Sequence, residues 1–453
     1  MQNLTYNEHY KKTLLLALPV CLSNMGYMLV GIVDAKMVGM IEPGQFGYSG
    51  TEAQAAVALA NSFYSVVLVM GIGISYGITP LVAAADSSGD NAMKANALKN
   101  GFYINLISNV LLFGVLFFIS PVLNLFQQEP KVVELAIPFM NVMIFGMVPL
   151  SIFFTFKQFA EGLSLTIVTM IATLAGNALN ILLNWILIFG HWGFEPMGLQ
   201  GSCWASFIAR IFMALILFAY LFWNSRFKIY WNEMKKIKLN WKISKKIIDL
   251  GFSTGLQWVF EVGAFTLAVV WMGQLGKDEQ AAHLIAISVA AFTYMFASGF
   301  SAGTSIRVGN YFGVKNKTGL RRAAFAGLHV TVTCMAVFAI CFLLFRDFIA
   351  ESFSIDANVI GIASSLILIA AFFQIFDGIQ VVVLGALRGI EDTKIPTVIT
   401  LISYWAFGIP ICYVLAFNFS MGAEGIWWGL SAGLCIAAIL VLWRFNVVSK
   451  KLF

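Results

Sequence analysis

Residues 360–387, IGIASSLILIAAFFQIFDGIQVVVLGAL, form an apolar stretch with a single charged residue, Asp377. As an α-helix, this stretch is long enough to cross a hydrocarbon core of about 30 Å. The sequence therefore predicts an all-α integral membrane protein with about 12 transmembrane helices. The expected spans are approximately 13–39, 53–84, 99–126, 132–158, 167–189, 200–223, 250–275, 280–305, 323–345, 360–387, 395–417 and 425–445.

The composition supports a membrane environment. Of 453 residues, 60% are hydrophobic and 11% are charged, whereas soluble proteins have about 25% charged residues. So few charges cannot cover the surface of a water-soluble fold. The six cysteines lie in or near the apolar stretches without a CxxC or Cys/His cluster, so we expect them to be small core residues. A soluble domain, a disordered chain and a disulfide scaffold are excluded.

The basic residues predict the orientation of the chain. If both termini face one side, 23 of the 28 Lys and Arg residues fall on that side and four on the other, with Arg210 inside the sixth span. Because basic residues concentrate in cytoplasmic loops, we expect both termini in the cytoplasm. Eight of the basic residues lie between 226 and 246. Attraction to anionic lipid explains them there, and no nucleic-acid partner is expected.

The two halves of the chain are internal repeats. GISYG at 73–77 matches GFSAG at 299–303, and MGLQG at 197–201 matches MGAEG at 421–425. Each half has six spans, an even number, so the two repeats have the same orientation in the membrane. This predicts two six-helix lobes related by a pseudo-twofold axis along the membrane normal. A cavity between such lobes is the expected transport path. We expect an N-terminal lobe at 1–225, a basic cytoplasmic linker at 226–249 and a C-terminal lobe at 250–453.

The repeated glycine segments formally fit GxSxG, the nucleophile turn of serine hydrolases. That turn joins a strand to a helix, whereas both segments here lie inside long apolar spans. Small residues that allow close helix packing and a soft kink explain them better. Since no nucleotide-binding fingerprint is present either, we expect neither an enzyme nor an ATP-driven pump.

Three acidic residues, Asp34, Glu261 and Asp377, lie inside expected spans and away from their ends. A carboxylate at membrane depth costs about 2.5 kcal/mol or more, so without a partner it tends to bind a proton or a cation. Each is therefore a candidate for coupling to Na⁺ or H⁺. We expect Glu261 and Asp377 to form the coupling site, with Na⁺ as one possible occupant and Tyr294 presenting its ring or hydroxyl to the ion.

Polar and aromatic residues accompany these acids at helical spacing. An indole and a phenyl ring share the helix face of Glu261, amides flank Asp377, and a serine shares a face with Tyr294. They can line a substrate cavity, or they can simply form hydrogen bonds between helices. These residues are Trp258, Phe265, Gln374, Gln380 and Ser298.

Asp34 has possible partners in Asn177, Asn180 and Asn184, whose spacing places three amides on one face of the fifth span. The amides could hold the carboxylate or relay its protonation. A packing network that merely joins helices is the alternative, and the sequence leaves both open. Arg210 could balance a carboxylate, but the sequence does not identify which.

Three motifs suggest a family. They are VDAKMVG at 33–39, EGLSLT at 161–166 before the asparagines, and ALRGIEDTKIP at 386–396. With Glu261 and Asp377, they make nearly the whole chain resemble the multidrug and toxic compound extrusion (MATE) transporters, and in particular their NorM branch.

The resemblance implies antiport of organic cations, including drugs and dyes, in exchange for Na⁺ or H⁺, with the lobes rocking between inward-open and outward-open states. It implies a monomer without a cofactor in the bacterial cytoplasmic (inner) membrane. In this branch carboxylates matching Glu261 and Asp377 form a cation site, and Tyr294 matches an aromatic residue associated with it. Phe373 stands where some relatives carry a tyrosine.

A lipid-linked oligosaccharide flippase of the same superfamily is the alternative function. Such a flippase would more often need basic residues in its cavity and frequently has fourteen spans. Three acids against one or two bases, and about twelve spans, favour the drug antiporter. The 41 Phe, 12 Trp and 18 Met residues favour bulky apolar cations, because aromatic faces attract cations and thioethers adapt to varied shapes.

Overall fold

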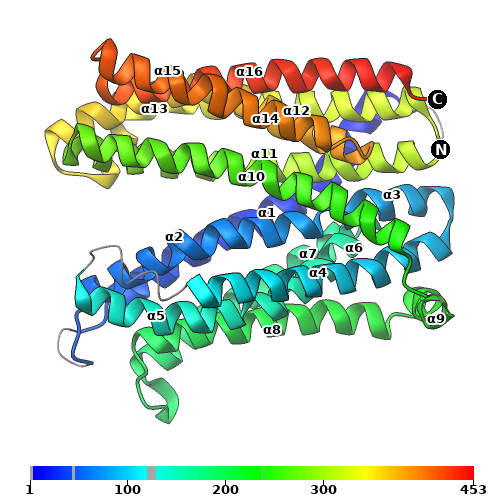
Figure 1. The fold of residues 1–453 in the computed structure, drawn as a ribbon, viewed down its shortest axis with the longest axis horizontal. Coiled ribbons are helices and arrows are strands. Elements are labelled where there is room, and N and C mark those ends of the chain that lie inside the picture. The colour runs from blue at the N-terminus through cyan, green and yellow to red at the C-terminus, as the bar shows by residue number, and fades with distance from the viewer. Residues whose placement is uncertain (1–3, 43–45, 120–128, 237) are drawn as a thin grey trace. The chain divides into compact units, whose positions relative to one another are not determined.

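The computed structural model describes residues 4–42, 46–119, 129–236 and 238–453. Within them, 12 helical segments are long and apolar enough to cross a membrane, which confirms the predicted number of spans. The protein is thus an all-α, multi-pass membrane protein (Figure 1). Its helices are α1 (Tyr6–Gly39), α2 (Gly50–Ser75), α3 (Ile78–Ser88), α4 (Asn91–Ile119), α5 (Pro130–Phe145), α6 (Met147–Gly162), α7 (Thr166–Phe189), α8 (Leu199–Trp223), α9 (Lys228–Lys236), α10 (Trp241–Leu275), α11 (Lys277–Gly313), α12 (Lys317–Phe353), α13 (Ala357–Gly389), α14 (Lys394–Leu401), α15 (Ile409–Tyr413) and α16 (Gly422–Lys451).

Several spans are not single regular helices. The second span consists of α2 and α3, and the fourth consists of α5 and α6, which meet at Gly146. The eleventh span alternates α14 and α15 with two π-helical segments, Ile402–Gly408 and Val414–Asn418. Two short 3₁₀ turns, His191–Gly193 and Ser225–Phe227, flank α8. These interruptions change which residues face the same side of a span.

The contacts divide the chain into two compact units. The N-terminal unit comprises Met25–Val82 and Gly89–Gly255, and the C-terminal unit comprises Met1–Asn24, Ala83–Ser88 and Leu256–Phe453. This division differs from the expected lobes at 1–225 and 250–453, because α1 and α10 are each shared between the units. The beginning of α1 packs in the C-terminal unit, and the beginning of α10 packs in the N-terminal unit.

The repeated glycines explain this sharing. A methyl group on Gly299 of α11 would lie 2.3 Å from the Cys21 sulfur of α1, and one on Gly73 of α2 would lie 2.3 Å from the Gly255 Cα of α10. Backbones approach so closely only where side chains are absent. The predicted packing role of both motifs is therefore confirmed. The predicted kink occurs in the first copy, where α2 ends at Ser75, whereas α11 runs unbroken through the second.

The expected linker at 226–249 is largely helical and belongs to the N-terminal unit. It contains α9 and the beginning of α10. Tyr230 is buried beneath the Lys94 ammonium, 5.1 Å from the ring centre, and the Lys99 ammonium donates to the Met234 carbonyl over 2.9 Å. Two basic residues of α4 thus hold this segment against that helix.

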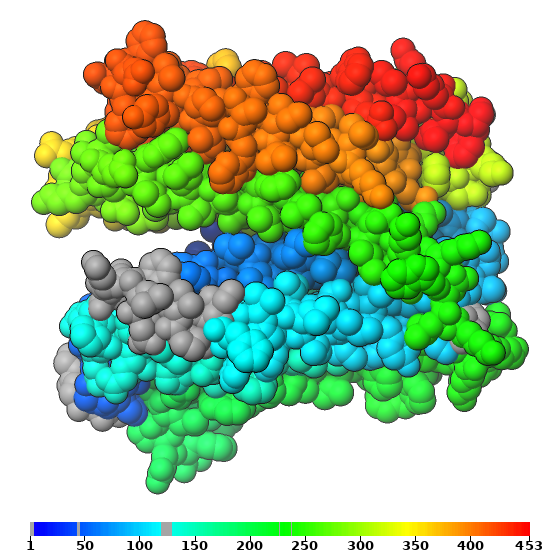
Figure 2. Space-filling model, viewed as in Figure 1, coloured from blue at the N-terminus to red at the C-terminus, as the bar shows by residue number. Residues whose placement is uncertain are grey.

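The core of the C-terminal unit is built around α13. This helix contacts α11, α12 and α16, and its buried face is rich in Ala, Ile, Leu and Val. The eleventh span packs against α16 (Figures 1 and 2, orange beside red). Methyl groups on Gly425 and Gly429 of α16 would lie 2.7 Å from the Ala416 nitrogen and 2.4 Å from the Cys412 nitrogen. These glycines form a face of α16, which we call the glycine face, and the absence of side chains there lets the eleventh span pack closely against it.

Candidate functional site

Two acids meet inside the C-terminal unit. Helix α10 carries Glu261 and helix α13 carries Asp377, with 8% and 3% of their surfaces exposed. The two carboxylates are close enough to interact electrostatically. In the part of the chain that the structure describes, neither accepts a hydrogen bond from another residue or forms an ion pair. Two buried carboxylates without partners provide a place for a proton or a cation.

A tyrosine that the sequence analysis did not single out completes this cluster. Tyr404, on the first π-helical segment of the eleventh span, is fully buried. Its hydroxyl donates to the Gln380 side-chain oxygen over 3.1 Å. It also lies within electrostatic range of Glu261, Asp377 and Tyr294. We call Glu261, Asp377, Tyr404, Gln380 and Tyr294 the C-terminal polar cluster.

The other expected substrate-cavity residues lie around this cluster or beside it. Phe265 stands between the rings of Phe373 and Tyr404, at centroid distances of 6.0 and 6.4 Å. Gln374 is buried and donates to the Thr293 hydroxyl over 2.5 Å. Half-buried Trp258 lies one turn before Glu261 on α10.

Ser298 forms a hydrogen bond between two helices. Its hydroxyl accepts a hydrogen bond from the Asn24 amide over 3.3 Å. This bond joins α11 to the beginning of α1 within the C-terminal unit. Ser298 thus fits the alternative weighed for it, a hydrogen bond between helices.

The N-terminal unit carries the third acid. Asn184 donates to the Asp34 carboxylate over 2.5 Å. In the orientation that satisfies both ends of its amide, Asn180 also donates to Asp34, over 2.8 Å, and accepts from the Ser206 hydroxyl over 3.1 Å. Asn177 stands apart, since its buried amide nitrogen has no partner within the described residues. Two of the three expected amides therefore hold Asp34.

Arg210 on α8 lies in the same unit. Its guanidinium donates to the Tyr64 hydroxyl over 2.8 Å and to the Met143 carbonyl over 3.2 Å. It also lies within electrostatic range of Asp34. The structure thus gives Arg210 the partners that the sequence left open, and its positive charge attracts the Asp34 carboxylate without a direct ion pair.

A buried ion pair also escaped the sequence analysis. Lys157 and Glu161 on α6 are each 1% exposed, and their charged atoms lie 3.8 Å apart. The Thr169 hydroxyl donates to Glu161 over 3.4 Å, and the Lys157 ammonium lies 5.6 Å from the centre of the Tyr27 ring. The spacing of four residues was the available signal, but Lys157 fell at the end of the expected span 132–158 and Glu161 in the EGLSLT motif just after it.

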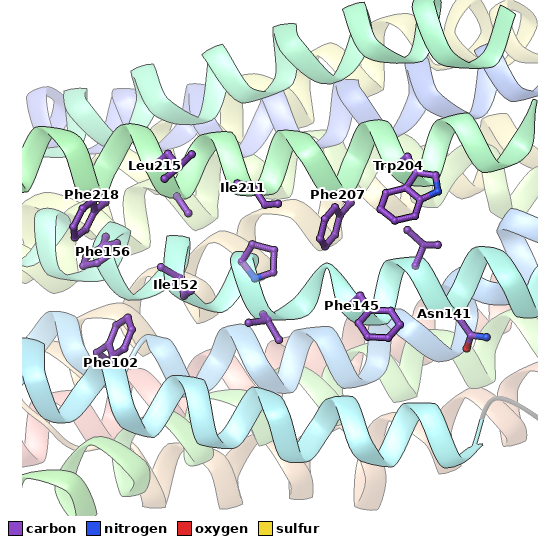
Figure 3. Close-up of a pocket in the computed structure, with 14 residues that line it drawn as sticks. Phe102, Asn141, Phe145, Ile152, Phe156, Trp204, Phe207, Ile211, Leu215 and Phe218 are labelled. Carbon is purple, nitrogen blue, oxygen red and sulfur yellow. The ribbon is translucent and has the colours of Figure 1, made fainter. Parts of the chain in front are cut away.

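Figure 3 shows an apolar pocket in the N-terminal unit. It has a volume of about 970 Å³ and is lined mainly by aromatic and aliphatic side chains of α4, α5, α6 and α8, among them Phe102, Phe145, Phe156 and Trp204. Asn141 is the polar residue among the 14 lining it, and none is charged. No residue expected in the cation site lines this pocket, so the polar clusters remain the candidate functional sites.

Comparison with known proteins gives the same family throughout. The MatE family model matches residues 19–186 and 254–414. The probable multidrug resistance protein NorM of Rhizobium meliloti (strain 1021) is 30% identical over 97% of this chain and 94% of its own length. The probable multidrug resistance protein NorM of Xanthomonas campestris pv. campestris (strain ATCC 33913) is 32% identical over 98% of this chain and 95% of its own.

Solved structures share the fold. The eukaryotic MATE transporter AtDTX14 superimposes with a TM-score of 0.86 at 20% identity, covering 98% of this chain and 96% of that chain. An outward-facing multidrug resistance MATE family transporter of the MOP superfamily superimposes with a TM-score of 0.88 at 19% identity. The superposition covers 98% of this chain and 97% of that chain. Both therefore confirm the all-α fold of this chain.

Proposed function

Because the chain belongs to the MatE family, we propose that it is a multidrug efflux transporter that exports organic cations in exchange for Na⁺ or H⁺. It would be a secondary antiporter of the bacterial cytoplasmic membrane, with both termini in the cytoplasm, working as a monomer without enzymatic activity or a cofactor. The names of the relatives support the multidrug part of this proposal. The polar clusters support the coupling part.

The observation that carries the proposal is the pair of buried carboxylates in the C-terminal polar cluster. Glu261 and Asp377 come from different helices and interact with each other. A monovalent cation between them would offset their repulsion and their loss of hydration. An organic cation that displaces this ion would exchange one positive charge for another, which is the elementary event of antiport.

Coupling requires that the ion and the substrate favour different conformations. A ligand that binds both conformations equally does not change the equilibrium between them. Because Glu261 and Asp377 lie on α10 and α13, any movement of α10 relative to α13 changes the separation of the carboxylates and therefore their affinity for the ion. We propose that this dependence drives a rocker-switch cycle between inward-open and outward-open states.

The test is uptake of ethidium into proteoliposomes under separately imposed Na⁺ and H⁺ gradients. We expect one gradient to drive uptake in the wild type, and we expect Glu261→Gln and Asp377→Asn each to abolish it. Glu351→Gln, which removes an exposed carboxylate of the C-terminal unit, is the matched control. Wild-type uptake by either well-folded cluster variant would exclude the proposed coupling site, and transport driven by neither gradient would exclude antiport.

A further inference from the structure

The eleventh span places one phenolic hydroxyl beside two acids that accept no hydrogen bond. Tyr404 is fully buried, its hydroxyl bonds to α13 one turn after Asp377, and its ring lies 6.4 Å from the ring of Phe265, one turn after Glu261 on α10. Its one hydrogen bond among the described residues runs to the Gln380 side-chain oxygen, over 3.1 Å. The phenolic proton is thus directed at Gln380.

This arrangement fixes what the tyrosine offers to the two acids. A hydroxyl has one proton and two lone pairs, so a phenol that donates its proton to Gln380 keeps its lone pairs available to a cation. Lone pairs and carboxylates repel one another unless a positive charge lies among them. Oxygen atoms of carboxylates, carbonyls and hydroxyls are the ligands that hard cations prefer. The oxygen atoms of Glu261, Asp377 and Tyr404 therefore suit a small monovalent cation.

The local backbone explains how the hydroxyl reaches this position. Tyr404 lies in the π-helical segment Ile402–Gly408, and such segments often occur at functional sites because they turn side chains away from the regular helical register. Gly408, at the end of that segment, packs against Gly433 of α16, with a methyl group on Gly408 placed 3.3 Å from the Gly433 Cα. The glycine face of α16 thus holds the segment in place.

We propose that Tyr404 is a direct ligand of the coupling ion and that Gln380 positions its hydroxyl. The proposal rests on the proposed antiport function and extends it by a residue of the eleventh span. Tyr404 would supply a neutral oxygen that raises the affinity for the ion without adding negative charge. Gln380 would act through Tyr404, because it accepts the phenolic proton that would otherwise point at a carboxylate.

The test measures the Na⁺ and H⁺ dependence of ethidium uptake for Tyr404→Phe in proteoliposomes. Removing one neutral ligand should raise the half-saturating concentration of the coupling ion about tenfold, or about 1.4 kcal/mol. The maximal rate at saturating ion should stay near that of the wild type. Tyr413→Phe is the matched control, because it removes a hydroxyl from an exposed residue of the same span. It should leave both quantities unchanged.

A second variant and a binding measurement keep the outcome clear. Gln380→Met should shift the half-saturating concentration in the same direction but less, and direct binding of ²²Na⁺ to purified, monodisperse protein should follow the transport data. An unchanged ion dependence in Tyr404→Phe would overturn the inference while leaving the proposed function standing. A wild type that responds to neither ion would instead refute the proposed function itself.

Discussion

At the scale of single residues, Asp34 differs from the other two acids because two amides hold it. Asn184 and Asn180 both donate to its carboxylate, whereas Glu261 and Asp377 accept no bond within the described residues. A satisfied carboxylate has less need of a bound cation. We therefore expect Asp34→Asn to impair ethidium efflux from intact bacteria while ²²Na⁺ binding to the purified variant stays measurable.

The exposed Glu134 of the N-terminal unit gives a control for the Asp34 experiment, since Glu134→Gln removes a carboxylate from the same unit. That variant should retain wild-type efflux. Loss of Na⁺ binding in folded Asp34→Asn protein would contradict the separate roles assigned to Asp34 and to the C-terminal polar cluster.

The Lys157–Glu161 pair leads to a prediction about stability. Because both charges are buried, removing one partner leaves the other uncompensated, which typically costs about 3–5 kcal/mol. We expect Lys157→Met and Glu161→Gln each to lower the melting temperature of detergent-solubilised protein. The double variant should melt above the less stable single variant, because it buries no unpaired charge. If the decrease in melting temperature of the double variant equalled the sum of the two single decreases, the two side chains would not interact.

Some candidate site residues could be predicted from the sequence and others could not, for a physical reason. A carboxylate inside an apolar span is so costly that the positions of Asp34, Glu261 and Asp377 in the sequence were enough to predict them as candidate site residues. Tyr404 could not, because a tyrosine in an apolar span has no such cost and its π-helical segment does not follow the helical period. The partner of Arg210, Tyr64, lies 146 residues away, and no local spacing points to it.

At the scale of helices, the close contact between α15 and α16 predicts a strong effect of glycine substitution. A methyl group on Gly429 would lie 2.4 Å from the Cys412 nitrogen, so any side chain there must push the eleventh span away. We expect Gly429→Leu to lower both the melting temperature and ethidium uptake, because the displaced span also carries Tyr404.

Gly361 on α13 provides the comparison for Gly429. A methyl group at Gly361 would have no neighbouring atom within 4 Å, and alanine is favoured over glycine in a helix by about 1 kcal/mol. Gly361→Ala should therefore match or exceed the wild type in melting temperature. Equal stability of Gly429→Leu and the wild type would show that the close contact does not hold the span.

At the scale of the whole molecule, the sequence predicted the number of spans and the internal repeat, but not how the chain is divided by its contacts. Apolar length identifies a span wherever it lies, and matched motifs identify the repeat. Neither reveals which helix packs on a motif. The glycines of α2 and α11 pack against the beginnings of α10 and α1, and these contacts place Met1–Asn24 in the C-terminal unit.

Ion coupling is a property of the complete transport cycle, and it yields a prediction about pH. If Na⁺ and H⁺ share the carboxylates of Glu261 and Asp377, protonation neutralises the groups that bind Na⁺. Lowering the pH from about 8 to about 6 should then raise the apparent Kd for Na⁺, because protons compete for the same oxygens. Asp34→Asn should preserve this dependence, since Asp34 lies in the N-terminal unit, outside the C-terminal polar cluster. Direct ²²Na⁺ binding at both pH values measures the effect, and an identical Kd at the two would mean that protons do not use the C-terminal polar cluster.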